Sequence, residues 1–149
     1  MPRLMSVGRL DMNSEGLLLL TNDGELAGHL AHPDTGWTRQ YRVRVHGAVD
    51  DVTLAALAKG VTIDGVAYAP VYAELEQQRD SNAWLQVRLS EGKNREIRKI
   101  FEHFGLPVNR LIRVRYGAFQ LGKLKKGHVA PVKTAQLREL LPGKFKKRV

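Results

Sequence analysis

The 149-residue sequence contains no cysteine, which excludes disulfide bonds and thiolate metal sites. It has no apolar run of about 18 residues and no signal-like start, so we expect a cytoplasmic protein without a membrane partner. Acidic residues are few: 15 Asp and Glu stand against 24 Lys and Arg, and the formal charge is +9. This excess indicates a polyanionic partner. RNA or DNA is favoured over a membrane surface because the basic residues are spread over several predicted elements.

Hydrophobic spacing predicts short helices interleaved with strands. Helices are expected over residues 24–32, 50–58, 94–104 and 134–141. Strands are expected over residues 16–20, 38–49, 71–76, 83–89 and 111–119, with a hairpin over residues 61–68. This order is not a regular βαβα alternation, and short turns join several strands. The predicted class is therefore α+β, with a mainly antiparallel mixed sheet and flanking helices. The length suits one domain over residues 1–149, ending in a basic tail at residues 144–149.

A lone acidic residue, Asp11, lies in a loop rich in Gly, Asn and Ser, directly before the apolar run Gly16–Leu20. A short apolar run closed by turn residues is typical of a buried strand. A loop that leads into such a strand can present a carboxylate to a substrate. The same pattern is also compatible with an Asp that caps a turn, and with Arg9 as a solvated charge.

Residues 38–49 alternate between apolar and basic side chains, which predicts a strand with one face packed and the other exposed to solvent. Tyr41 belongs to the apolar set, whereas Arg42 and Arg44 belong to the basic set. Tyr41 is therefore either a core residue or an aromatic residue at the edge of a site. The two arginines are placed to meet phosphate groups.

The predicted helix over residues 94–104 has its apolar side chains at positions i, i+3, i+4 and i+7: Ile97, Ile100, Phe101 and Phe104. Arg98 lies about 100° round the helix from Ile97, on the flank of this stripe. From there its guanidinium can reach a carboxylate on a neighbouring loop. The alternatives are an exposed arginine or an i+4 ion pair with Glu102.

Two stretches of the chain resemble one known family. Gly-Arg-Leu-Asp at residues 8–11, followed by Ser-Glu-Gly-Leu-Leu-Leu-Leu-Thr-Asn-Asp-Gly at residues 14–24, looks like the catalytic-aspartate motif of the RNA pseudouridine synthases of the RsuA/RluB/RluE/RluF class. Residues 91–102 and 111–117 are also similar to that family, and closest to its RluB-like branch. The matching positions run from about Gly8 to Gly127, most of the chain.

This resemblance implies roles for individual residues. Asp11 takes the place of the catalytic aspartate, the ring of Tyr41 stacks on the target uracil, and Arg98 pairs with Asp11. Ile97 packs near the tyrosine ring, and Arg9 holds the RNA around the displaced base. Further substrate contacts are expected from basic and polar residues on three predicted elements: Asn94, Arg95, Arg42, Arg44, Arg113 and Arg115.

The function expected from these roles is isomerisation of a uridine in ribosomal RNA, of the large-subunit 23S type, to pseudouridine. No cofactor and no metal are expected, because the substrate carries its own leaving group and acceptor carbon. His29 and His32 are not predicted to bind metal, since their spacing is three rather than four and no third ligand is placed. The alternatives are a noncatalytic basic RNA-binding module and a metal-dependent nuclease.

In the resembled family the catalytic domain starts with a strand bearing a Lys-Pro-x-Gly pattern, usually behind a small separate RNA-binding domain. Neither is found here, so we expect a domain that is incomplete at its N-terminus. Gln40 also stands where a lysine is common in the family. A monomer is expected, and a dimer formed through an exposed sheet edge is the alternative.

Overall fold

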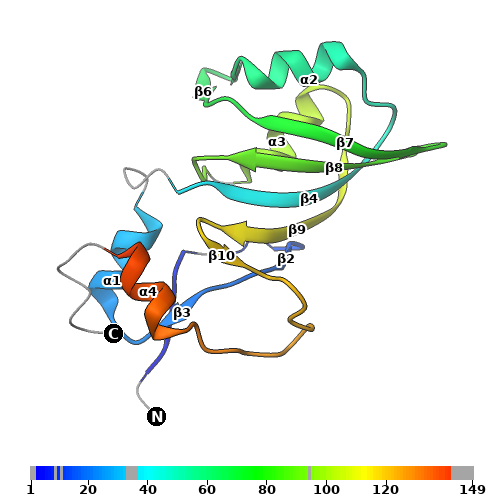
Figure 1. The fold of residues 1–149 in the computed structure, drawn as a ribbon. Coiled ribbons are helices and arrows are strands. Elements are labelled where there is room, and N and C mark those ends of the chain that lie inside the picture. Colours follow the sequence, from blue (N-terminus) through cyan, green and yellow to red (C-terminus); the bar gives the residue numbers. More distant parts are fainter. Residues whose placement is uncertain (1–2, 9, 11, 33–36, 94, 142–149) are drawn as a thin grey trace.

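The computed structural model of the chain describes residues 3–8, 10, 12–32, 37–93 and 95–141 (Figure 1). Four predicted site features lie outside these residues: Arg9, Asp11, Asn94 and the basic tail 144–149. The helices are α1 (Gly24–Ala31), α2 (Asp51–Ala58), α3 (Glu96–His103) and α4 (Thr134–Leu140). The longer strands are β4 (Arg39–His46), β7 (Tyr72–Arg79), β8 (Asn82–Leu89) and β9 (Val108–Tyr116). The shorter ones are β1 (Met5–Ser6), β2 (Glu15–Gly16), β3 (Leu20–Thr21), β5 (Val61–Ile63), β6 (Val66–Tyr68) and β10 (Phe119–Gln120).

One sheet organises the molecule. Its strands run in the order β10-β9-β4-β8-β7, every pair of them antiparallel, and β2 joins β9 as a parallel neighbour. Two further strand pairs, β1 with β3 and β5 with β6, lie outside this sheet. The predicted α+β class with a mainly antiparallel mixed sheet is confirmed.

Two hydrophobic clusters support the two ends of the molecule (Figure 1). The larger cluster joins α2 and α3 to one face of the sheet, where Val43 and Leu85 meet Leu57 and Phe101. The smaller one lies where α1 and α4 come together near β10. Tyr116 occupies its centre, and the Tyr116 hydroxyl donates a hydrogen bond to the carbonyl of Leu30 at 2.6 Å. Strands β4 and β9 run from one cluster to the other, so they can carry a site between them.

Asp23 and Asp50 cap the first two helices as their side-chain chemistry predicts. Asp23 accepts hydrogen bonds from the amides of Glu25 and Leu26, and Asp50 accepts one from Thr53 at 2.8 Å. Helix α3 begins later than predicted. Arg95 has a left-handed φ of 51° and interrupts the helical backbone before Glu96.

The prediction of a buried strand over residues 16–20 is wrong. The segment forms only the two-residue strands β2 and β3; Leu17 is buried, but Leu18 and Leu20 are exposed. Gly16 explains the break, because its φ of 110° suits glycine and a Cβ there would clash with the backbone of Arg113. The predicted strand 111–119 is likewise a hairpin of β9 and β10, turned at Gly117 with a φ of 59°.

Candidate active site

Tyr41 lies on the face of the sheet that α3 covers. Side chains alternate along β4, so Tyr41 shares this face with Val43 and Val45, which are fully buried. The pairing of β4 with β9 shifts its register between Gln40 and Tyr41, at the start of β4. Tyr41 itself is half-buried and packs against the rim of the larger cluster. Its ring is therefore held by the core at the edge of an opening.

Ile97 and Arg98 come to the same place from the start of α3. Ile97 is 5% exposed and lines one pocket together with Tyr41. Arg98 leaves the buried stripe, as its position on the helix predicts. Its Nη1 donates to the carbonyl of Val108 at 3.2 Å, and its Nη2 donates to the carbonyl of Asn13 at 2.8 Å. Its Nε is buried and has no hydrogen-bond partner among the described residues.

The loop before β2 completes this arrangement. Leu10 and Ser14 line the pocket, and Asn13 accepts the hydrogen bond from Arg98. The described residues of this loop therefore contact both the pocket and the arginine. Asp11 is part of the same loop in sequence, but it lies outside the described residues.

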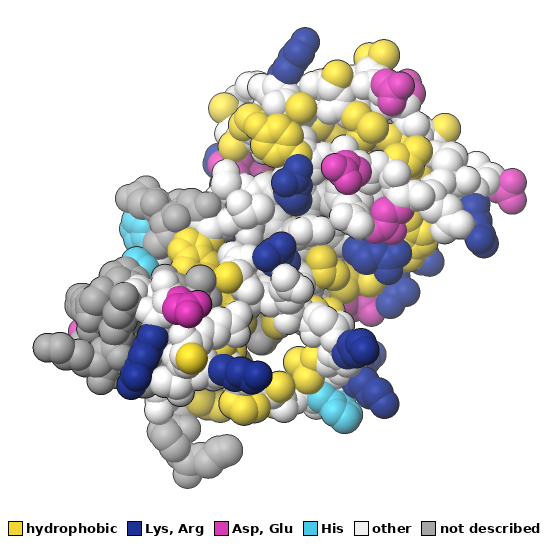
Figure 2. Space-filling view, in the orientation of Figure 1, with side chains coloured by type: hydrophobic (Ala, Val, Ile, Leu, Met, Phe, Trp, Pro, Cys, Tyr) yellow, Lys and Arg dark blue, Asp and Glu magenta, His cyan; other side chains and the backbone are white. Residues whose placement is uncertain are grey.

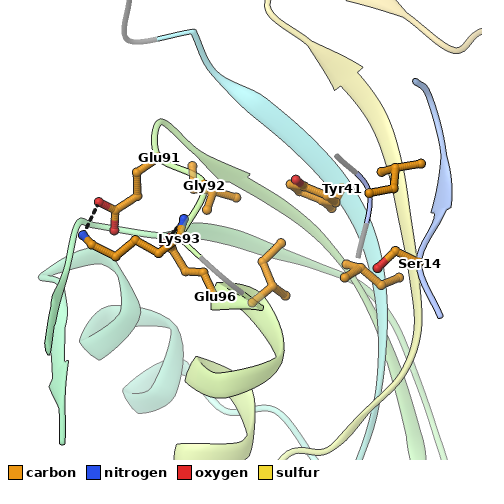
Figure 3. Close-up of a pocket in the computed structure, with 10 residues that line it drawn as sticks. Ser14, Tyr41, Glu91, Gly92, Lys93 and Glu96 are labelled. Carbon is orange, nitrogen blue, oxygen red and sulfur yellow. Dashed lines mark hydrogen bonds and ion pairs between the residues drawn. The ribbon is translucent and has the colours of Figure 1, made fainter. Parts of the chain in front are cut away.

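Figure 3 shows the pocket between two walls. Ser14 lies at one side and the segment with Glu91, Lys93 and Glu96 at the other, with Tyr41 between them. The lining residues come from the loop, from β4, β8 and β9, and from the segment that leads into α3: Leu10, Ser14, Tyr41, Leu89, Glu91, Gly92, Lys93, Glu96, Ile97 and Leu111. The lining is apolar at its centre and polar at both sides, which suits a flat heterocycle with polar edges.

The polar wall contains a carboxyl group that is nearly inaccessible to solvent. Glu96 is 3% exposed, and burial raises its pKa to about 8. The nearby Glu91 carboxylate adds to this rise. Burial works against ionisation of Glu91 as well, but hydrogen bonds from Lys93 and from the amide of Ala69 lower its pKa overall. At neutral pH this wall therefore holds one protonated and one charged carboxyl group.

Comparisons with known proteins give the family. Residues 1–103 match the family model described as RNA pseudouridylate synthase. The chain belongs to this family. A Rickettsia felis protein named as an uncharacterized RNA pseudouridine synthase is 52% identical over 127 residues, which are 85% of this chain and 55% of that protein. The Escherichia coli ribosomal large subunit pseudouridine synthase B is 46% identical over 143 residues, 93% of this chain and 49% of that protein.

A crystal structure of a pseudouridylate synthase matches the fold with a TM-score of 0.81 and 30% sequence identity. The match covers 93% of this chain and 60% of that one. The chain thus spans about half the length of the curated relatives that it resembles.

Arg42 and Arg44, which we predicted to bind substrate, lie on the face of β4 opposite to Tyr41. Both guanidinium groups stack over the ring of Trp84, 4.5 Å and 5.5 Å from its centroid. Arg42 also pairs with Glu76 at 3.0 Å, and the Arg44 Nε donates to Asn109 Oδ1 at 2.6 Å. These arginines are not part of the pocket, and any contact they make with RNA occurs on the open face of the sheet.

Arg113 requires a correction. We predicted that Arg113 contacts the substrate, but Arg113 is 3% exposed. Its Nε donates to the carbonyl of Leu17 at 2.9 Å, and its guanidinium lies 5.2 Å from the ring centroid of Tyr116. The parallel approach of β2 covers this part of β9, because the amide of Leu17 also donates to the Arg113 carbonyl at 2.7 Å. Arg113 therefore fixes the segment that follows the Asp11 loop.

Arg95 and Arg115 have different environments. Arg95 is half-buried at the start of α3, next to the pocket wall. Arg115 is exposed on β9, and its Nε donates to the carbonyl of Gly117 at 3.0 Å. Both are placed where a solvent-borne ligand can reach part of the side chain. Asn94 lies outside the described residues.

Eight of the ten residues that line the pocket were not predicted as site residues, among them Leu10, Ser14, Glu91 and Glu96. A signal for Glu96 was available. It follows Lys93 by three residues at a helix start, where a Glu commonly reaches back to a backbone amide, and Glu96 Oε1 accepts from the Lys93 amide at 3.0 Å. Leu10 and Ser14 gave no periodic signal, because the loop has none.

The part of the chain that the structure describes contains no group of three or more His, Asp or Glu placed to bind a metal ion. The same residues include no helix that is long and apolar enough to cross a membrane.

Proposed function

We propose that this chain isomerises a uridine in RNA to pseudouridine. One observation carries the proposal: Tyr41 and Ile97 line a single pocket, and Arg98 binds the backbone of the loop to which Asp11 belongs. Three segments far apart in sequence meet there, which phosphate binding alone does not require. Membership of the RNA pseudouridylate synthase family and the names of the relatives support the same reaction.

In the proposed reaction the bond between ribose C1′ and uracil N1 breaks, the freed base rotates, and C1′ bonds to C5 instead. C5 then loses its proton and N1 gains one, so the product is an isomer of the substrate. Asp11 is the nucleophile or base in this sequence. Arg98, a permanent cation whose buried Nε has no partner among the described residues, keeps the carboxylate ionised and in position.

The base reaches the pocket only after it leaves its stack, at a cost of a few kcal/mol. The ring of Tyr41 offers a surface on which the uracil stacks, and Ile97 closes the pocket beside it. Single-stranded loops lower the cost of base flipping, so we expect the target uridine to lie in one.

We further propose that the target is large-subunit ribosomal RNA in the cytoplasm. The support is the name of the Escherichia coli relative, a ribosomal large subunit pseudouridine synthase. We propose a monomer as the active form. The outer strand of the sheet, β7, carries Glu74 and Glu76, and charges on an edge strand disfavour pairing with a second sheet.

The test is tritium release from RNA transcripts labelled at uridine C5. Product formation must release this label, because C5 exchanges its hydrogen for the bond to ribose. We expect stoichiometric release from one site in a ribosomal transcript, unchanged by a chelator. Tight binding without release would favour the noncatalytic binding module, and chelator-sensitive strand cleavage would favour the nuclease.

The open face of the sheet supplies a separate prediction about affinity. Figure 2 shows that Lys and Arg side chains outnumber acidic ones across the visible surface. Arg44 makes no ion pair among the described residues, so its charge is available to a phosphate. We expect Arg44→Ala to lower the slope of log affinity against log salt by about 0.7 to 0.9. Fluorescence anisotropy with labelled RNA at several salt concentrations measures this slope.

The matched control is Arg44→Lys, which keeps the charge but loses the planar stacking on Trp84. We expect it to restore the slope. Equal slopes for the alanine variant and the unmodified chain would show that no phosphate binds at Arg44.

A further inference from the structure

The pocket wall over residues 91–96 contains two carboxyl groups that the proposed chemistry does not use. Glu96 is almost completely buried. Its Oε1 accepts a hydrogen bond from the amide of Lys93 at 3.0 Å, whereas its Oε2 is buried and has no hydrogen-bond partner among the described residues. A buried carboxylate oxygen without a donor is costly, whereas a protonated carboxyl is neutral and can itself donate.

Glu91 is the charged member of the pair. Its Oε1 accepts from the amide of Ala69 at 2.7 Å, and its Oε2 forms an ion pair with Lys93 Nζ at 2.7 Å. The Lys93 ammonium also donates to the carbonyl of Ala67 at 3.1 Å. Glu91 therefore connects the pocket wall to Ala69, the residue after β6, and Lys93 connects it to Ala67 within β6.

Other charged and titratable groups surround this wall. Lys93 lies 5.6 Å from the ring centroid of Tyr68 on β6, and Arg39 on β4 packs against Gly92. The described hydrogen bonds of Arg39 go to Trp37, Ser90 and Tyr116, not to either glutamate. Lys93 is bound to Glu91, and Arg95, half-buried at the start of α3, is the other cation of this segment.

We propose that Glu91 and Glu96 share one proton, carried by Glu96, and that this proton holds the pocket wall where Ile97 and Arg98 need it. Glu96 immediately precedes these two residues at the start of α3. Loss of the proton leaves a negative charge on the 3% exposed Glu96, near the charged Glu91, and we expect the segment then to move apart. Glu96 is a positioning residue in this scheme. Its expected effect on catalytic activity rests on the proposed function.

The direction of the pH effect follows from the raised pKa of Glu96. Burial, reinforced by Glu91, raises this pKa from 4.5 to about 8, so the folded chain retains a proton that the unfolded chain releases. The free energy of unfolding therefore falls as the pH rises from about 4.5 to about 8. If the protonated form is the active one, kcat/KM falls about tenfold between pH 7 and pH 9.

Glu96→Gln is the decisive variant. A glutamine keeps the acceptor for the Lys93 amide and offers an N–H toward Glu91 at every pH. We expect its thermal unfolding midpoint to lose the decline between about pH 4.5 and about pH 8, and its kcat/KM to lose the decline between pH 7 and pH 9. Glu102→Gln, an exposed change on the same helix, is the matched control and should behave like the unmodified chain.

Two outcomes overturn the proposal. One is an identical pH dependence of the unfolding midpoint in the unmodified chain and in Glu96→Gln. The other outcome needs no variant and comes from carbon-13 NMR of the unmodified chain. It is the finding that every glutamate carboxyl titrates below about pH 6. A carboxyl that titrates near pH 8, in a chain that makes no pseudouridine, would support the shared proton and refute the proposed function. The two failures are therefore distinguishable.

Discussion

Replacement of Asp11 by asparagine is expected to abolish pseudouridine formation while leaving RNA affinity nearly unchanged. Asparagine has the size of aspartate but is neither a nucleophile nor a base, so the step at C1′ has no catalyst. We expect kcat/KM to fall roughly 10³-fold or more. Tritium release from C5-labelled RNA measures the activity, and fluorescence anisotropy measures the affinity.

Glu15→Gln is a useful control for this experiment. Glu15 lies four residues after Asp11 and forms an exposed ion pair with Arg110 at 2.9 Å. An exposed pair of this kind contributes little to stability, so the variant should remain active. Equal activity of Asp11→Asn and the unmodified chain would refute the assignment of Asp11.

Replacement of Arg98 by lysine is expected to lower kcat/KM about 10²-fold, even though the charge is retained. The arginine donates to two backbone carbonyls, of Val108 and Asn13, and its buried Nε has no partner within the described part of the chain. A lysine ammonium cannot make this planar set of contacts at one time. The loop that holds Asp11 then shifts, and small shifts of catalytic groups cost about this much.

The same variant should be less stable by about 1–3 kcal/mol, because a part-buried carbonyl loses its donor. Denaturant unfolding measures this loss, and steady-state kinetics measures the activity. Lys99→Ala, at the exposed neighbouring position, is the control and should change neither quantity appreciably. Full activity of Arg98→Lys would mean that Arg98 contributes charge alone.

Much of the fold could be predicted because local chemistry determines it. The Asp23 and Asp50 caps fix two helix starts, and alternation along β4 puts Tyr41 on the packed face and Arg42 on the open one. The turn at Asp64 and Gly65 joins β5 to β6 as expected. In each case residues close in sequence carry the whole signal.

The errors arise where distant segments meet. Gly16 breaks the predicted strand because β9 approaches it closely, and the same contact buries Arg113. No periodicity along residues 16–20 or 111–119 contains that information. The environment of Glu91 depends likewise on the amide of Ala69, which lies 22 residues away in the sequence.

The most direct test of the account is to map pseudouridine at single-nucleotide resolution in unmodified large-subunit ribosomal RNA after incubation with the chain. We predict one new pseudouridine, in a single-stranded loop, that is absent when Asp11→Asn is used instead. RNA that binds the unmodified chain but acquires no pseudouridine would contradict it.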